Sequence, residues 1–299
     1  MWKYLYSPCS LNMSVVKLFY GPVTEHLLVN FKLELTDNGV LIATMNNPTK
    51  LNALDGVAVA EFFFITEYAE REPSVKVVVW TGSGRAFSAG ANFASLGVPK
   101  NHALYPSIMA YNKAGKGLRR FPDVAMKSWL FRMLEFNKIS VCAVNGIAIG
   151  GGANFALLMH DFVFAADGDA RFKYPFSELG IPPEMGSSFL FPRLFAKRFI
   201  MTGEWFDGHD AEKIGLVYKV VPRESLLKEA VDYATKLAVN ESLEGMQMSK
   251  RIMNDRVIDQ LNLFRVCDIE NETIDKALQS DYTIRSIQRF VGKHGKSKL

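Results

Sequence analysis

The sequence predicts an α/β fold in which parallel strands are connected by helices. Apolar segments typical of buried strands, such as VKVVVWTG (75–82) and ISVCAVNG (139–146), alternate with segments of helical character. Buried parallel strands are apolar nearly throughout because helices cover both faces of their sheet. From residue 224 onward the pattern is helical only, which predicts a helical C-terminal region with little sheet of its own.

The organised fold is predicted to start at Phe31. FKLELT and VLIATMN alternate apolar and polar residues on either side of Asp37-Asn38-Gly39, a pattern typical of a β-hairpin. The segment NNPTKLNAL is predicted to be a loop, and a helix from about 55 to 72 follows it. GRAFSAGANF (84–93) is predicted to be a loop that leads into a short helix.

A long helical region (100–137), which carries no readable motif, is expected after this loop. A helix through ANFALLMH and two short strands, DFVFAA and ARFKYP, follow the second buried strand. Beyond residue 224 we expect three helical stretches: ESLLKEAVDYATKLAV, SLEGMQMSKRIMND and an amphipathic run to about Phe290.

Composition limits the class of protein. The 299 residues are 48% hydrophobic, enough for a sizeable core in one large domain or two small ones. The net charge of +4 is too diffuse for a nucleic-acid-binding face, so we expect no nucleic-acid partner. The widely spaced Cys9, Cys142 and Cys267 form no metal-type pair and indicate a reducing compartment. Without a signal-peptide pattern or an apolar run of roughly 18 residues, we expect a soluble protein with no membrane span.

Two segments of small residues follow predicted strands and precede helix starts: Ser88-Ala89-Gly90-Ala91 and Ile149-Gly150-Gly151-Gly152. The first N–H groups of a helix have no partner within it, and two that converge form an oxyanion hole. Tight packing of a strand on a helix is the competing explanation for the second segment. A dinucleotide-binding turn is disfavoured because the glycines do not follow the G-x-G-x-x-G spacing.

Glu184 lies in YPFSELGIPPEMGSS (174–188), directly after two prolines. Pro182 and Pro183 each fix their own φ, and Pro183 also keeps the preceding residue out of the helical region. A carboxylate on such a stiff turn is placed rigidly, as a catalytic base requires. From these residues alone, an ordinary glutamate favoured by the dipole of the following helix is the stronger interpretation.

From about Phe31 to Phe290 the chain resembles the crotonase superfamily of enoyl-CoA hydratases and isomerases. The resemblance rests on four segments in the expected order: NPTKLNAL, GSGRAFSAGANF, VNGIAIGGGANFALLMHDFVFAADGDARFKYPFSELGIPPEMGSS and TGEWFDGHDAEKIGLVYKVVP. Within the superfamily the chain is most similar to the peroxisomal Δ3,Δ2-enoyl-CoA isomerases, in which a YPF or TPF segment leads to a glutamate followed by small residues. The resemblance implies an α/β spiral of β-β-α turns and a helical C-terminal region that assembles trimers, sometimes hexamers.

The resemblance also implies the residues of the site. Glu184 is expected to be the catalytic acid/base, and the backbone N–H groups of Ala91 and Gly151 are expected to hold the thioester oxygen of an acyl-CoA substrate. CoA is then part of the substrate, and no separate cofactor is expected. The CoA and acyl path is expected to be lined by Lys50, Leu51, Ala53, Ala89, Gly90, Asn92, Phe93 and Phe176.

Two departures from the superfamily pattern distinguish between reactions. Hydratases of the superfamily carry two glutamates, and the corresponding positions here hold Asn154 and Phe176. Hydration needs a base on the water and an acid on carbon, so the loss of both carboxylates argues against a hydratase. Dienoyl-CoA isomerases use a pair of acids, and the one near Phe176 is missing.

One carboxylate suffices for the 1,3-proton shift that converts a 3-enoyl-CoA to a trans-2-enoyl-CoA in the β-oxidation of unsaturated fatty acids. We therefore expect a Δ3,Δ2-enoyl-CoA isomerase. A hydratase, a dienoyl-CoA isomerase and a non-catalytic acyl-CoA-binding module remain the alternatives.

Three further polar residues are expected to be structural. Glu178 is expected to be a surface or salt-bridging residue, His160 a helix cap and His209 an N-terminal partner of a short helix. No cluster of His, Cys and Asp has metal-ligand spacing, so no metal is expected.

The last three residues, Ser297-Lys298-Leu299, match the peroxisomal targeting signal. They predict a location in the peroxisomal matrix and the import receptor as a partner. We expect an N-terminal extension (1–30), a core with the active site (31–223), a helical region (224–292) and a flexible tail with the signal (293–299). Whether translation starts at Met1 or at Met13 stays open.

Overall fold

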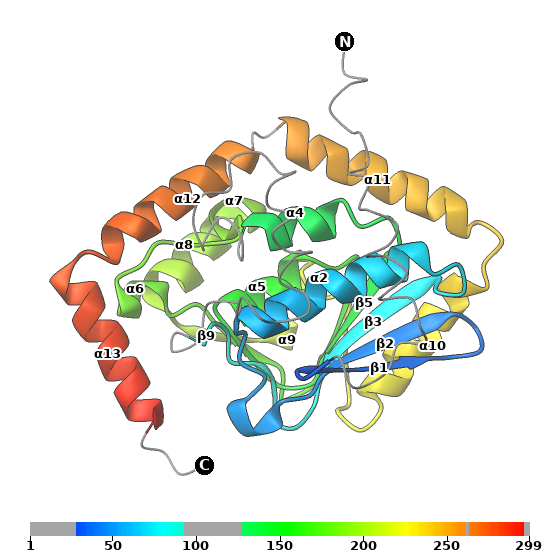
Figure 1. Cartoon of the computed structure of the whole chain (residues 1–299), viewed down its shortest axis with the longest axis horizontal. Helices are drawn as coiled ribbons and strands as arrows, with labels where there is room; N and C mark the ends of the chain where they lie inside the picture. The colour runs from blue at the N-terminus through cyan, green and yellow to red at the C-terminus, as the bar shows by residue number, and fades with distance from the viewer. Residues whose placement is uncertain (1–27, 93–126, 261–262, 296–299) are drawn as a thin grey trace, which may run out of the picture.

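The computed structural model of the chain describes residues 28–92, 127–260 and 263–295 (Figure 1). No helix in these ranges is long and apolar enough to cross a bilayer. The strands are β1 (Phe31–Leu35), β2 (Val40–Met45), β3 (Val77–Gly82), β4 (Ala86–Ser88), β5 (Ile139–Val144), β6 (Ile147–Ile149), β7 (Phe162–Ala166), β8 (Arg171–Lys173), β9 (Trp205–Asp207) and β10 (Lys219–Val221). The helices are η2 (Pro48–Lys50), α2 (Gly56–Arg71), α4 (Ser128–Leu134), α5 (Gly151–Leu158), α6 (Phe176–Leu179), α7 (Ser187–Leu190), α8 (Arg193–Thr202), α9 (Gly208–Lys213), α10 (Leu226–Ala238), α11 (Leu243–Gln260), α12 (Leu263–Ala277) and α13 (Asp281–Gly295).

The strands form two sheets, with orders β1-β2-β3-β5-β7-β10 and β4-β6-β8-β9. In the larger sheet β2 to β10 are parallel and β1 is antiparallel to β2, as the predicted hairpin requires. The chain passes from β3 to β4, from β5 to β6 and from β7 to β8, and each pass contributes one strand to each sheet. The predicted α/β spiral of β-β-α turns is therefore confirmed.

The second sheet corrects one prediction. Residues 84–93 were expected to be a loop before a helix, whereas Ala86–Ser88 form β4, which pairs with β6. The pairing explains the difference, because strands of three residues are too short to show an alternating pattern. Phe93 and most of the expected helical region 100–137 lie outside the described residues, which resume before α4.

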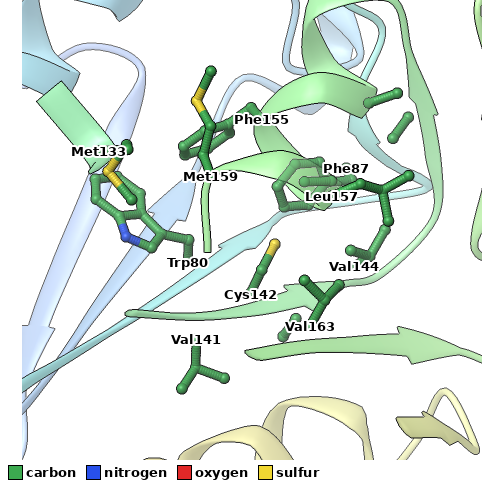
Figure 2. Close-up of a cluster of buried hydrophobic side chains, with 14 of the residues drawn as sticks. Trp80, Phe87, Met133, Val141, Cys142, Val144, Phe155, Leu157, Met159 and Val163 are labelled. Carbon is green, nitrogen blue, oxygen red and sulfur yellow. The ribbon is translucent and has the colours of Figure 1, made fainter. Parts of the chain in front are cut away.

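The core lies on both faces of the larger sheet. Trp80 of β3 packs against rings from α2 and α5, and its centroid is 5.4 Å from Phe62 and 5.5 Å from Phe155. Figure 2 shows Cys142 of β5 pointing to this side of the sheet and Val141 to the opposite side. On the opposite side α10 packs against β2, β3, β5 and β7. Since both faces are covered, β5 is buried along its whole length and is apolar apart from Ser140.

The three C-terminal helices run along the outside of the molecule, α11 and α12 at one edge and α13 down the side (Figure 1). The expected single run to Phe290 is two helices, which end and begin on either side of Leu278–Ser280. Lys250 joins α11 to the core through a buried ion pair with Asp161 at 2.8 Å. Helix α12 packs against α7, the short helix that follows Glu184.

Candidate active site

The two segments of small residues lie against each other. Gly90 has φ +80°, and a Cβ there would lie 2.4 Å from the carbonyl oxygen of Ile149 and 3.7 Å from the nitrogen of Gly151. Only glycine fits both that backbone conformation and that approach. The end of β4 is thereby brought next to the start of α5.

The N–H groups of Ala91 and Gly151 lie where the local secondary structure offers them no acceptor. Ala91 forms a parallel bridge with Leu54 in which Leu54 and Asn92 make the hydrogen bonds, so the N–H of Ala91 points away from the bridge. Gly151 is the first residue of α5, where an N–H has no acceptor within the helix. In the part of the chain that the structure describes, neither N–H donates to a backbone carbonyl.

Asn52, which the sequence analysis did not single out, fastens the loop 47–54 to this region. It is buried and has φ 53°, a conformation that asparagine tolerates better than most residues. Its side-chain nitrogen donates to the carbonyl oxygens of Ser83 (3.0 Å) and Ala86 (2.9 Å). The hydroxyl of Ser88 donates a hydrogen bond to the main-chain carbonyl oxygen of Asn52 at 2.8 Å. These bonds hold the segment that contains Lys50, Leu51 and Ala53 beside β4.

The turn that carries Glu184 lies between α6 and α7. Three donors hold the Glu184 carbonyl oxygen: the N–H of Ser187 (3.1 Å), the hydroxyl of Ser187 (2.7 Å) and the side-chain amide of Asn154 (3.0 Å). The residue after Glu184, Met185, has φ 56°, a strained conformation for a side chain of this size. The Glu184 backbone is therefore fixed by hydrogen bonds within the turn and by one from α5.

The carboxyl group of Glu184 is buried beside the start of α5. A Cβ on Gly151 would lie 3.2 Å from Glu184 Oε1, 3.5 Å from the sulfur of Met185 and 3.9 Å from Leu54 Cδ1. Burial, and to a smaller extent the charge of Glu270, raises the pKa of Glu184 from 4.5 to about 7. A carboxyl group with this pKa can both accept and return a proton near neutral pH.

The two positions at which related enzymes are expected to carry further acids hold other side chains here. Asn154 is fully buried, and its Oδ1 has no hydrogen-bond partner among the described residues. Phe176 is buried with its ring toward Gly150, where a Cβ would lie 4.0 Å from Cε1. Tyr174 is also fully buried, its hydroxyl has no partner in the described ranges, and burial and the charge of Glu184 raise its pKa.

The structure brings together most of the residues expected to line the substrate path. Lys50 is exposed, Gly90 is buried, and the other members within the described ranges, except Phe176, are half-buried. Phe93 and the targeting residues Ser297, Lys298 and Leu299 lie outside the described residues.

Of the three residues expected to be structural, Glu178 behaves as expected and the two histidines do not. Glu178 forms the expected ion pair, with Lys173 at 2.7 Å. His160 is not a helix cap: its ring centroid lies 4.8 Å from that of Phe155, and the shielding of its ring from water lowers its pKa to about 3. His209 lies within α9, which Asp207 caps, and its Nε2 is 3.1 Å from Asp167.

The two described cysteines, Cys142 and Cys267, are buried free thiols, and no cluster of potential metal ligands occurs in the described ranges.

Comparison with known proteins agrees with this arrangement. Residues 35–297 match the family model of enoyl-CoA hydratase/isomerase. The chain is 28% identical over 271 residues to 1,2-epoxyphenylacetyl-CoA isomerase of Escherichia coli, covering 89% of this chain and 92% of that protein. It is 32% identical over 226 residues to a probable enoyl-CoA hydratase of Rhizobium meliloti, covering 73% and 79%.

A solved structure shows the same fold. The crystal structure of an enoyl-CoA hydratase/isomerase from Pseudoalteromonas atlantica superimposes with a TM-score of 0.73 at 25% identity, covering 89% of this chain and 98% of that one. The segments that form the site, from β2 to α7, all fall within the matched residues. The chain therefore belongs to the enoyl-CoA hydratase/isomerase family, the crotonase superfamily.

Proposed function

We propose that the protein is a Δ3,Δ2-enoyl-CoA isomerase in which Glu184 alone carries the proton. The observation that supports this reaction is the carboxyl oxygen of Glu184 beside Gly151, with an amide at Asn154 and an apolar ring at Phe176. The carboxylate of the nearby Glu270 accepts hydrogen bonds from Gly186 and Ser188 of the same turn, so we assign it no proton transfer.

In the proposed mechanism the ionised Glu184 removes a proton from C2 of a 3-enoyl thioester. The electron pair of the broken C2–H bond passes to the thioester oxygen and gives a dienolate. When Glu184 returns the proton to C4, the C3–C4 double bond is lost, a C2–C3 double bond forms and the thioester carbonyl is restored. The N–H groups of Ala91 and Gly151 would bind that oxygen, and an oxyanion donor of this kind contributes about 3 kcal/mol. Apolar neighbours such as Phe176 and Leu54 would keep water from the dienolate.

A hydratase is the second candidate, because several similar proteins are described as enoyl-CoA hydratases. Hydration requires one group to activate water and another to protonate carbon. Asn154 cannot act as a base, and its amide is bonded to the Glu184 carbonyl oxygen. The side chains of this chain therefore fit the isomerase proposal better than they fit the hydratase activity for which several relatives are named.

The proposal includes an acyl-CoA substrate and no separate cofactor. The exposed Lys50 is suited to the phosphates of CoA, while Leu51, Ala53 and Ala89 would line the way to the thioester. We also propose a homo-oligomer, because large apolar side chains are exposed on α8, α11 and α12, among them Leu194 (80%), Ile252 (64%) and Ile269 (55%). A peroxisomal location remains the proposal made from the targeting signal, and localisation of the tagged chain with and without Leu299 tests it.

The deciding experiment offers the purified protein 3-enoyl-CoA, 2-enoyl-CoA and 3,5-dienoyl-CoA side by side. We expect the 3-enoyl substrate to be converted fastest. Glu184→Gln should remove turnover while calorimetry still detects acyl-CoA binding. Glu178→Gln changes a partly exposed glutamate of the same segment and should retain turnover. Dominant hydration of the 2-enoyl substrate would establish the hydratase instead, and binding without any turnover would establish a binding module.

A further inference from the structure

The turn Glu184–Ser188 is held from two sides by elements far apart in sequence. On one side Asn154 of α5 donates to the Glu184 carbonyl oxygen. On the other side Glu270 of α12 accepts hydrogen bonds from the N–H groups of Gly186 (2.8 Å) and Ser188 (3.2 Å). The hydroxyl of Ser188 donates to the same carboxylate. These bonds link the turn to the C-terminal helix α12 through Glu270.

Packing leaves the turn little room to move. Gly186 has φ +72°, and a Cβ there would lie 2.8 Å from Leu130 of α4 and 3.3 Å from Leu263 of α12. The backbone that follows Glu184 is thus enclosed by α4 and α12, and the carboxylate of Glu270 binds its N–H groups from the same helix. A displacement of α12 would displace this backbone.

Glu270 is itself buried, with 5% of its surface exposed. Burying a carboxylate is unfavourable unless hydrogen bonds replace water, and its three donors do so here. A glutamine would fit the same space but would turn an NH₂ group toward one of the donors. The position is therefore suited to an ionised acid, which brings a second negative charge near Glu184.

We propose that Glu270 is a positioning residue for Glu184: it fixes the turn that carries the proton-transferring carboxyl and sets a like charge beside it. The inference rests on the proposed role of Glu184. The electrostatics support it, because the charge of Glu270 adds to burial in raising the pKa of Glu184. Burial raises the pKa of Glu270 too, while hydrogen bonds from Ser188 and Gly186 oppose that rise and favour its ionised form.

The other charged or titratable groups at this place are few. Tyr174, which follows β8, faces Glu184. On α12, the charges of Glu270, Asp268 and Lys127 act on the pKa of Cys267. Lys127 forms an ion pair with Asp268. Burial raises the pKa of both Tyr174 and Cys267, and the charge of Glu184 adds to the rise for Tyr174 and that of Glu270 to the rise for Cys267, so both side chains stay neutral over the range in which Glu184 titrates.

The test measures the titration of Glu184 without relying on turnover. Full-length protein labelled with ¹³C at glutamate carboxyl carbons is titrated by NMR, and the Glu184 signal is assigned by its loss in Glu184→Gln. In Glu270→Gln we expect the pKa of Glu184 to fall by about one unit, as removal of a neighbouring like charge requires. Glu61→Gln is the matched control, because Glu61 is another buried carboxyl with two backbone donors, but those donors are Val29 and Asn30.

Two kinetic readouts complete the test. With the acyl-CoA that the wild-type protein turns over, Glu270→Gln should move the acid limb of kcat/KM to lower pH. Glu270→Asp keeps the charge but is one methylene shorter, so it should lower kcat about tenfold with KM nearly unchanged. It also serves if Glu270→Gln does not fold.

The inference is overturned if Glu184 titrates in Glu270→Gln as it does in the wild type, if Glu61→Gln shifts it equally, or if Glu270→Asp keeps the wild-type kcat. Failure of the isomerase proposal would appear differently, as absence of 3-enoyl-CoA turnover in the wild-type protein. In that case the NMR titration still tests the link between the two carboxyl groups.

Discussion

The side-chain amide of Asn154 donates a 3.0 Å hydrogen bond to the main-chain carbonyl oxygen of Glu184. Asn154 stands where the superfamily pattern places a glutamate, and here its amide holds the backbone of Glu184, the proposed catalytic residue. Asn154→Ala should lower the free energy of unfolding by about 1–2 kcal/mol, because a buried hydrogen bond is lost. It should reduce turnover less than Glu184→Gln does, since Ser187 still holds the same oxygen.

Denaturant unfolding and steady-state kinetics measure both effects. Asn154→Asp is the stricter variant, because an ionised carboxylate would face the Glu184 carbonyl oxygen and should destabilise the protein more. An Asn154→Ala protein as stable and as active as the wild type would show that this bond does not support the turn.

The pH dependence of the reaction should follow the ionisation of Glu184. Its pKa is about 7, and only the ionised form can remove the C2 proton. We therefore expect kcat/KM to fall tenfold per pH unit below about pH 7 and to level off above it. A profile that stays flat down to pH 5 would exclude Glu184 as the base.

Glu184 should also make the stability of the protein depend on pH. Its pKa is raised from 4.5 to about 7, so the folded state binds more protons than the unfolded state between these values. Stability from this group is present at low pH and is lost as the pH rises through that window. Glu184→Gln does not titrate, so its stability relative to the wild type should increase between these two pH values, by about 3 kcal/mol at most.

Chemical denaturation at pH 4.5, 6 and 8 measures this difference. Glu178→Gln is the control, because that carboxyl is about half exposed and its stability difference should change far less. A constant difference for Glu184→Gln across the range would contradict the raised pKa.

A methyl group on Gly151 should disturb catalysis more than folding. It would lie 3.2 Å from Glu184 Oε1 and 3.5 Å from the Met185 sulfur, so the carboxyl has to move by a few tenths of an ångström. We expect Gly151→Ala to lower kcat roughly tenfold. Gly245→Ala on α11, where nothing lies within 4 Å, should keep full activity and stabilise the helix by about 0.5–1 kcal/mol.

Kinetics and thermal unfolding of the two variants, compared with the wild type, decide this prediction. Equal activity of Gly151→Ala and Gly245→Ala would mean that the start of α5 does not contact the reacting groups.

Long and strongly patterned elements could be predicted from the sequence. The hairpin of β1 and β2, the buried strand β5 and the helix α2 are confirmed with ends that differ by one or two residues. Within the four-stranded sheet, β8 lies in the predicted strand ARFKYP, whereas β4, β6 and β9 were not predicted, because each has three residues and is defined by its neighbours. The break between α12 and α13 was also missed, since the apolar pattern continues through Leu278.

The site shows the same division. Glu184 could be predicted because prolines and the family pattern mark it in the sequence. Glu270 could not, because it is one of several acidic residues on an amphipathic helix and its partners are more than eighty residues away. Asn52 was missed for the same reason: its role is to bond to the carbonyl oxygens of Ser83 and Ala86, which no local pattern reveals.

The bond between Gly186 and Glu270 spans 84 residues of chain. During synthesis the ribosome releases the turn with Glu184 well before it releases α12. A nascent chain would therefore contain the proposed proton-transferring residue before it contains the group that fixes its turn. If Glu184 has the proposed role, its turn is fixed only after α12 has docked, so catalytic activity should appear late in folding.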